Sequence, residues 1–355
     1  MVNPLIPYKG RGAPVNLPNR FEKIQLERDE EWGEEDPAPK TQFLKDTSRT
    51  IITYNNSPDI GFRASINPYR GCEHGCIYCY ARPTHEYAGM SAGLDFESKI
   101  LVKMDAPELL RRELSAKSWK PQMLMISGVT DCYQPIERRL ALTRRCLQVL
   151  AEFRNPAGII TKSRLVVRDI DILQDLSRYQ CAGVTLSVTT LRPELAQILE
   201  PRAALPAARL KAISALAQAG IPVGVNVAPI IPGLTDHEMP AILKAAREAG
   251  ARWAGRVIVR LPWAVAPLFE RWLQAHMPDA KEKILHRIRE VRGGKLYDSR
   301  WGVRGRGEGP YAEHLADLFN VGRRKAGFSD DHTPISTAHF RRSSPPPAGP
   351  QLEFF

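Results

Sequence analysis

The chain has 355 residues, 43 % of them hydrophobic, which is enough to bury one sizeable core and a small appendage. Its N-terminal sequence has no apolar segment behind its charges, and the one long uncharged stretch, residues 213–234, is broken by Pro222, Pro229 and Pro232. The sequence therefore predicts neither an export signal nor a membrane span, and we expect a cytoplasmic protein without a membrane partner. A formal net charge of +11 is compatible with a polyanionic partner.

An alternation of strands and helices follows a Pro-, Gly- and acid-rich arm, residues 1–60, which we expect to be partly disordered. Six strands are predicted at residues 64–71, 122–129, 157–163, 182–189, 222–230 and 252–262, with helices near 105–117, 136–152, 169–177, 205–219 and 236–249 between them. Strands joined by single helices form right-handed crossovers and a parallel sheet. Six units are too few to close an eight-fold barrel, so the predicted fold is α/β, a partial (β/α)6 TIM-like barrel over residues 61–265.

A helical C-terminal extension is predicted over residues 266–327, with helices near 266–276, 278–292 and 311–325. Residues 328–355 are rich in Pro and Ser and predict a disordered tail. Within the extension, residues 281–306 contain nine Lys or Arg and three acidic residues. This excess is typical of a surface that binds DNA or RNA, and equally of a solvated helix face.

Three cysteines, Cys72, Cys76 and Cys79, follow the first predicted strand within eight residues. In a reducing compartment a disulfide framework is not expected, so the cluster favours a metal. A structural zinc site normally has four protein ligands, and His74 is available as the fourth, although its gaps to the flanking cysteines make it hard to wrap all four groups around one ion. Three cysteines that merely occupy a turn are a second alternative. The third is a [4Fe–4S] cluster, in which three thiolates leave one iron with an open coordination position for a reacting ligand.

The spacing Cys-x3-Cys-x2-Cys, with Tyr78 before the last cysteine, resembles the signature of the radical S-adenosylmethionine (SAM) enzymes. This resemblance implies that SAM binds the open iron and is reductively cleaved to methionine and a 5′-deoxyadenosyl radical. It also implies an external flavodoxin- or ferredoxin-like electron donor. The usual fold of that superfamily is a partial (β/α)6 barrel, which agrees with the strand count.

Polar side chains lie on one face of a predicted strand and at the carboxyl ends of others, where a barrel would have its mouth. The fourth strand alternates apolar and hydroxyl residues, so that Thr185, Ser187 and Thr189 share one face. Lys162 ends the third strand, and residues 128–131 follow the second. Such residues at the carboxyl ends of barrel strands predict a ligand site, although hydroxyls in a wet core are the simpler alternative for the fourth strand.

Six segments narrow the resemblance: HGCIYCYARPT, SGVTDCYQP, IITKS, TLSVTT, ILEP and VNVAPIIPG occur in the order found in the spore photoproduct lyase-like and DNA repair photolyase-like branch. By position, this resemblance implies six residues that contact SAM: Tyr78, Thr130, Asp131, Lys162, Ser187 and Thr189. Tyr78 and Tyr80 correspond to two tyrosines involved in hydrogen transfer.

One position departs from that branch, because Gly128 stands where the lyase carries its hydrogen-donating cysteine. Cys132 lies four residues further on, roughly 13 Å away if the strand continues, and is a candidate donor only if the chain turns sharply. Spore photoproduct repair itself is therefore not predicted.

These observations predict a radical SAM enzyme that cleaves SAM at a [4Fe–4S] cluster and acts on an unassigned substrate, for which nucleic acid is the candidate. The alternative is a non-catalytic iron–sulfur or zinc protein that binds nucleic acid.

Overall fold

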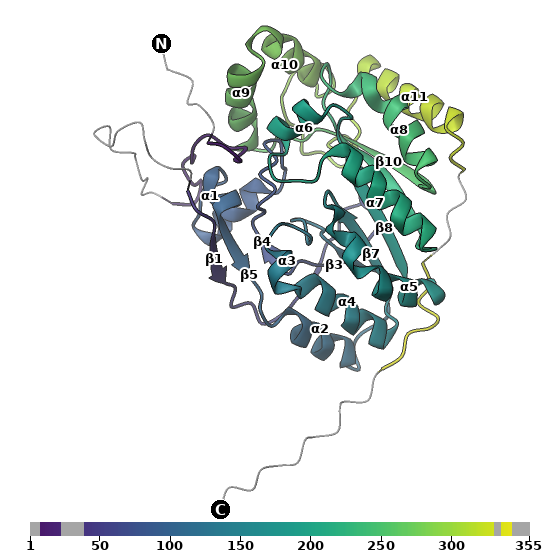
Figure 1. Cartoon of the computed structure of the whole chain (residues 1–355). Helices are drawn as coiled ribbons and strands as arrows, with labels where there is room; N and C mark the ends of the chain where they lie inside the picture. Colours follow the sequence, from purple (N-terminus) through teal and green to yellow (C-terminus); the bar gives the residue numbers. More distant parts are fainter. Residues whose placement is uncertain (1–7, 23–38, 330–334, 343–355) are drawn as a thin grey trace, which may run out of the picture.

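The computed structural model describes residues 8–22, 39–329 and 335–342. A seven-stranded sheet with the order β10-β9-β8-β7-β6-β3-β2 forms its centre (Figure 1). Six strands run parallel: β3 (Ala64–Ile66), β6 (Leu124–Ile126), β7 (Ala157–Thr161), β8 (Ala182–Val188), β9 (Val223–Ile230) and β10 (Trp253–Ile258). The edge strand β2 (Ile52–Tyr54) pairs antiparallel with β3. The predicted partial α/β barrel is confirmed, as a sheet that stays open between β10 and β2.

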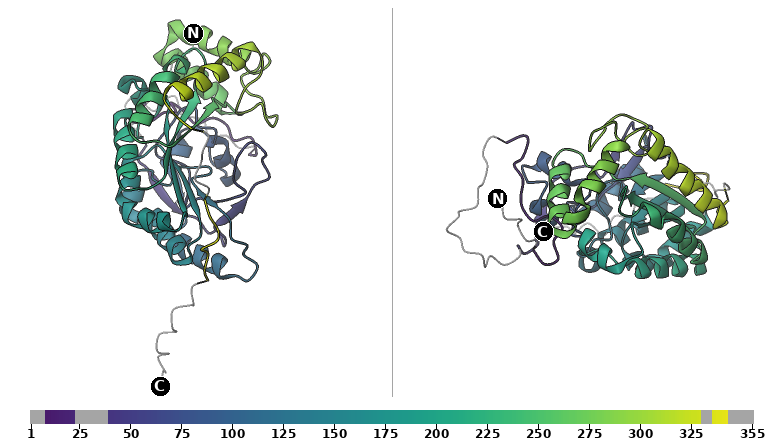
Figure 2. Two further views of the ribbon diagram at one scale, coloured as in Figure 1. Left: turned by 90° about the vertical axis from the view of Figure 1, so that its right-hand side faces the viewer. Right: turned by 90° about the horizontal axis from the view of Figure 1, so that it is seen from above.

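Helices cover the outer face of this sheet as one layer (Figure 2). They are α2 (Ala106–Ser115), α4 (Leu142–Phe153), α5 (Ile170–Arg178), α7 (Pro206–Gln218) and α8 (Met239–Glu248), whereas the short helix α6 (Pro193–Leu199) packs with α9 and α10. The single helix predicted at 136–152 is divided into α3 (Glu137–Leu140) and α4, because Ala141 adopts a left-handed conformation with φ of 51°.

The two faces of β8 show how the pattern of the sequence positions the site. Val184, Leu186 and Val188 are fully buried in the main core, against the helical layer. Thr185 points to the other face, where its hydroxyl accepts a 3.2 Å hydrogen bond from the indole of Trp253 on β10. Burial of each aliphatic side chain stabilises the fold by about 1.5–3 kcal/mol, so this alternation fixes which side chains face the barrel interior.

The C-terminal extension lies at the β10 end of the sheet (Figures 1 and 2). It consists of α9 (Val265–His276), α10 (Lys281–Glu290) and α11 (Pro310–Lys325). α9 and α10 share a second hydrophobic core with Ile77 of the cysteine loop, residues 70–82. α11 packs closely on α8, where a Cβ at Gly322 would lie 3.1 Å from the Leu243 side chain. None of the helices in the part of the chain that the structure describes is both long and apolar enough to span a bilayer.

Three features were not predicted. A small sheet pairs β1 (Gln42–Lys45), β5 (Lys99–Val102) and β4 (Tyr69–Arg70), strands too short to give a periodic signal. Within the expected arm, residues 8–17 pack on the cysteine loop. Within the expected tail, residues 335–342 pack at the amino ends of the barrel strands, where Phe340 lies 6.2 Å from Phe153. The other tail and arm positions, 1–7, 23–38, 330–334 and 343–355, lie outside the described residues.

Candidate active site

The three cysteines lie together in the loop between β4 and the short helix η1 (Arg82–Ala88). Cys72 and Cys76 are buried and Cys79 is partly buried. Burial raises the pKa of all three thiols, and the pKa of Cys72 is raised further by Asp131 and by the other two cysteines. Three neighbouring buried thiols ionise together only when a bound metal supplies positive charge. This donor set therefore fits an iron–sulfur cluster.

A buried ion pair stabilises the conformation of the cysteine loop. Arg82, which is fully buried, donates hydrogen bonds to the carbonyls of Cys76 (3.0 Å) and Gly75 (3.2 Å) and lies 3.3 Å from Glu97. Glu97 also accepts from the backbone of Gly12 (2.9 Å) and of Ala13 (2.8 Å). Gly75 has φ of 67°, and a Cβ there would lie 2.3 Å from the Glu97 carboxylate, so the position requires glycine. The N-terminal segment thus helps to hold the loop in shape.

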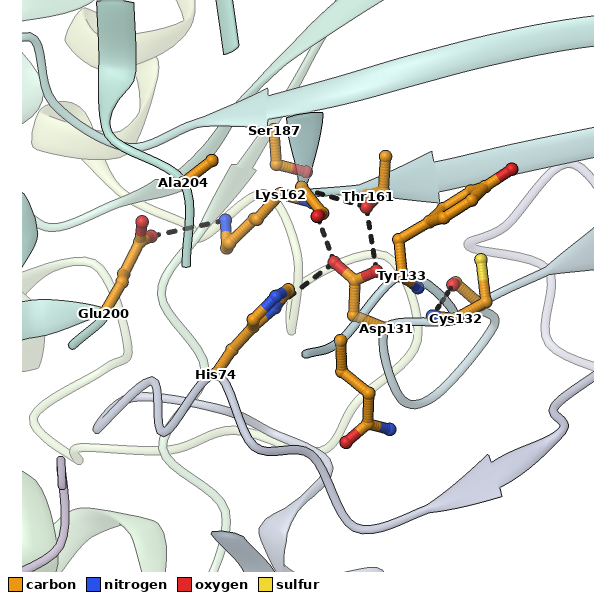
Figure 3. Close-up of polar contacts among 12 residues, drawn as sticks. His74, Asp131, Cys132, Tyr133, Thr161, Lys162, Ser187, Glu200 and Ala204 are labelled. Atoms are coloured by element: carbon orange, nitrogen blue, oxygen red, sulfur yellow. Dashed lines mark hydrogen bonds and ion pairs between the residues drawn. The ribbon is translucent and has the colours of Figure 1, made fainter. Parts of the chain in front are cut away.

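Asp131 joins the cysteine loop to the ends of two strands (Figure 3). Its carboxylate accepts hydrogen bonds from the Lys162 amide (2.7 Å), the Thr161 hydroxyl (2.8 Å) and the Tyr133 amide (2.9 Å), and lies 3.4 Å from Nδ1 of His74. Burial favours the protonated acid, but His74 and these hydrogen bonds outweigh it and lower the pKa of Asp131. His74 therefore faces Asp131. Within the described ranges, no three His, Cys, Asp or Glu side chains converge on one metal ion.

Glu200, which directly follows α6, is the second centre of the site. Its carboxylate accepts hydrogen bonds from Thr189 (2.7 Å), from the Tyr78 hydroxyl and from Arg209, and lies 3.4 Å from the Lys162 ammonium. Burial would raise the pKa of Glu200, but Arg209 and Lys162 outweigh burial and lower it strongly. Glu200 is thus a buried, ionised group that links Tyr78 of the cysteine loop to the mouth of the barrel.

The structure brings together most of the residues predicted to contact SAM. Tyr78, Asp131, Lys162 and Thr189 lie in the connected network just described, and Ser187 lies on the same face of β8 as Thr189. Thr130 is different, because its hydroxyl donates a 2.6 Å hydrogen bond to the carbonyl of Tyr69 and so faces β4.

The candidate hydrogen-transfer residues are not brought together. The Tyr80 hydroxyl donates to the carbonyl of Gly128 (3.1 Å), and its ring is exposed. Cys132 is 1 % exposed and belongs to the main core, and Figure 3 shows its sulfur on the side away from His74 and Lys162. The strand β6 ends at Ile126 and the chain turns at Ser127, with φ of 71°, so the distance expected for a continuing strand does not apply. The chain thus makes the sharp turn that the candidate required, while the Cys132 side chain lies in the main core, and its role as a hydrogen donor stays a prediction.

Sequence reasoning missed the roles of His74, Glu200 and Arg209. His74 was considered only as a zinc ligand, and Glu200 was noted only as part of the segment ILEP. An isolated acid in an apolar segment and an arginine on a predicted amphipathic helix are signals too weak to reveal a buried ion pair.

The fold is a parallel α/β barrel that is open on one side. Three cysteines lie in the loop that precedes η1, and polar groups lie at the carboxyl ends of the following strands. This arrangement is typical of enzymes that assemble a reactive cofactor at the barrel mouth. A sequence model of the radical SAM superfamily matches residues 66–246, just over half of the chain. The chain belongs to the radical SAM superfamily, and the predicted family is confirmed. Membership implies a [4Fe–4S] cluster and SAM as cofactors.

Relatives extend this assignment without adding a reaction. The chain is 34 % identical over 238 residues to the uncharacterized protein Rv2578c of Mycobacterium tuberculosis, covering 66 % of this chain and 69 % of that protein. It is 32 % identical over 199 residues to the uncharacterized protein MJ0683 of Methanocaldococcus jannaschii, covering 56 % and 71 %. Among solved structures, spore photoproduct lyase complexed with dinucleoside spore photoproduct superposes with a TM-score of 0.56 at 15 % identity, covering 80 % of this chain and 79 % of the lyase. The lyase shares the fold.

Proposed function

We propose that Cys72, Cys76 and Cys79 hold one [4Fe–4S] cluster with no fourth protein ligand, and that SAM binds between this cluster and the network of Lys162 and Glu200. When bound there, the two cofactors supply the reductive cleavage that yields methionine and a hydrogen-abstracting 5′-deoxyadenosyl radical. The observation that carries the proposal is the position of three thiols, two buried and one partly buried, beside a lysine, a carboxylate and hydroxyls from the ends of successive strands.

Each polar group of the mouth has a distinct task. The Lys162 ammonium, which donates to the Ala228 carbonyl (2.9 Å) and lies beside Thr189, provides positive charge for the carboxylate of SAM. A carboxylate has about four acceptor positions, and those of Asp131 are occupied by protein groups. Asp131 is therefore a positioning residue that fixes Lys162 and His74 relative to the cysteine loop. Glu200 in the same way fixes the Tyr78 ring beside the cysteines.

Iron content and SAM cleavage test this function directly. After anaerobic reconstitution, the chain should bind iron and sulfide and form 5′-deoxyadenosine when supplied with SAM and dithionite. Changing Cys72, Cys76 or Cys79 to Ala should abolish both, whereas Cys146→Ala, a fully buried cysteine of the main core, should retain them.

Two results would contradict the proposal. Tightly bound zinc without iron would exclude the cluster, and an iron–sulfur protein that forms no 5′-deoxyadenosine would favour the non-catalytic alternative. In the cell the electron would come from a flavodoxin- or ferredoxin-like donor, and dithionite replaces that donor in the assay.

A further inference from the structure

Four of the nine cations of the basic segment 281–306 are ion-paired or buried in the folded chain. Arg300 pairs with Asp298 (2.6 Å) and Glu308 (2.5 Å), and Arg304 pairs with Asp59 (2.6 Å). Arg287 pairs with Glu290, and Arg292 is buried and donates to backbone carbonyls. These four arginines are therefore engaged within the protein, and the use of the segment by a polyanion stays a prediction.

Arginines stacked on exposed aromatic rings form a different surface beside the cysteine loop. Arg260 lies 4.8 Å from the ring centre of Tyr80, Arg20 lies 4.3 Å from that of Trp263, and Arg304 lies 4.0 Å from that of Trp301. The three aromatic residues are 43 %, 56 % and 52 % exposed. We call these six residues the arginine–aromatic rim.

Neighbouring groups show that the members of the rim lie close to one another. Asp59 accepts hydrogen bonds from the Arg304 guanidinium (2.6 Å) and the Gly302 amide (2.6 Å); burial raises its pKa, but these bonds and the charges of Arg304 and Arg260 lower it. Burial and then Arg260 lower the pKa of Arg292 to about 10. Tyr297, three residues before Arg300, lies 6.1 Å from Trp263. The rim thus runs along the β10 side of the mouth.

The rim adjoins the cofactor site through Tyr80. This residue follows Cys79 directly, and its hydroxyl is bonded to Gly128 at the end of β6. Beyond Trp263, Arg20 also lies 5.1 Å from the Phe21 ring, which stacks on Tyr87 at 5.1 Å. Exposed aromatic rings therefore continue outward from the mouth across the N-terminal segment and η1.

Arg260 is the partly buried cation of the rim that forms no ion pair with a described residue. Arg20 and Arg304 each pair with a carboxylate, Glu86 and Asp59. For Arg260 no carboxylate partner occurs among the described residues, and its buried Nε has no hydrogen-bond partner. A guanidinium in this state matches a phosphate or carboxylate of a bound molecule.

We propose that the arginine–aromatic rim binds single-stranded nucleic acid and presents one nucleotide to the cofactor site; this names the substrate class of the proposed function and rests on it. Bases of any sequence stack on exposed aromatic and guanidinium faces, and a backbone phosphate pairs with Arg260. In a duplex the base faces are stacked on one another and unavailable, so the rim distinguishes single strands from duplexes. The chain's net charge of +11 complements such a polyanion.

Fluorescence anisotropy with labelled oligonucleotides tests the proposal on the reconstituted full chain. The probes are oligo-dT, oligo-U and a DNA duplex, each of about 12 nucleotides, within the usual site size for single-strand binding. We expect both single strands, or one of them, to bind more tightly than the duplex. The difference between the dT and U arms assigns DNA or RNA.

Matched variants identify the surface. Trp263→Ala and Trp301→Ala should each weaken single-strand binding roughly tenfold, and Arg260→Gln should in addition lower the slope of log affinity against log salt by about 0.7. The controls are Phe43→Ala, an exposed aromatic in the three-stranded sheet, and Arg178→Gln, an exposed arginine of α5; both should bind as the wild type. Iron content and thermal midpoint verify that each variant is folded.

The proposal is overturned if neither single strand binds, if the duplex binds as tightly, or if the controls lose as much affinity as the rim variants. 5′-Deoxyadenosine formation by the wild type is measured separately without oligonucleotide. A chain that cleaves SAM and binds no single strand disproves the rim alone. A chain that binds single strands through the rim and does not cleave SAM disproves the proposed function alone.

Discussion

Replacement of Glu200 by glutamine should destabilise the fold as strongly as any single change at the site. Glu200 and Arg209 form an ion pair in which both side chains are 1 % exposed. Glutamine keeps the shape and one carbonyl oxygen, but it removes the charge and turns an N–H group toward the donors of Tyr78, Thr189 or Arg209.

The size of the effect follows from the charge left behind. Removing one partner of a buried ion pair leaves the other charge uncompensated, which typically costs about 3–5 kcal/mol. Glu200→Gln should therefore lower the free energy of unfolding by about this amount. Glu248→Gln is the matched control, because Glu248 pairs with Lys244 at 3.9 Å on the exposed face of α8, where a pair is worth about 0.3–0.5 kcal/mol.

Urea unfolding followed by far-ultraviolet circular dichroism measures both variants. The pH dependence has a defined sign, because the pKa of Glu200 is lowered in the folded state. The stabilisation by Glu200 is complete above the pKa of a glutamate in an unfolded chain, about 4.3, and is lost only as the pH falls through the lower folded-state value. The difference between wild type and Glu200→Gln should thus stay constant from about pH 8 to about pH 5 and shrink at more acidic pH. A loss no larger than that of the Glu248 control would refute the assignment of Glu200 as a buried, paired charge.

Two further predictions concern residues placed in the site from sequence. Lys162→Ala should weaken SAM binding roughly ten- to a hundredfold, because a lost charged hydrogen bond costs about 1.5–3 kcal/mol, while the absorption spectrum of the cluster survives; an unchanged dissociation constant in isothermal titration calorimetry would remove Lys162 from the site. Cys132→Ala should cost about 1 kcal/mol of stability in urea unfolding through a small core cavity, and an unchanged free energy of unfolding would contradict its place in the core.

The barrel was predictable because its signals are local. Residues 182–189 alternate aliphatic and hydroxyl side chains, and the structure buries Val184, Leu186 and Val188 in the core while Thr185 faces the interior. The cysteine spacing is likewise a local pattern, so the loop and its family could be recognised within eight residues.

The network behind the cysteines was not predictable, because its contacts join distant parts of the chain. Tyr78 and Glu200 are separated by 122 residues and Arg82 and Glu97 by 15, and no periodic pattern marks either pair. The position of Cys132 depended on where β6 ends, and strand ends are determined by tertiary contacts such as the hydrogen bond from the Cys132 amide to Ser127 (2.6 Å). Sequence alone therefore indicated the proposed ligands of the cofactor, but not the distant groups that hydrogen-bond to them.

Gly128 occupies the position at which the resemblance to the lyase-like branch leads us to expect a cysteine. A Cβ at this position would lie 3.0 Å from the Cβ of Ser65 on β3 and 3.1 Å from its hydroxyl, so a cysteine side chain would require β3 to yield. The side chain that reaches Gly128 is instead Tyr80, which also lies under Arg260 of the rim. The fold is shared with the superfamily, whereas the substrate-facing surface that we propose consists of residues of this chain's own mouth. Tyr80 is therefore the point at which the cofactor site and the rim join.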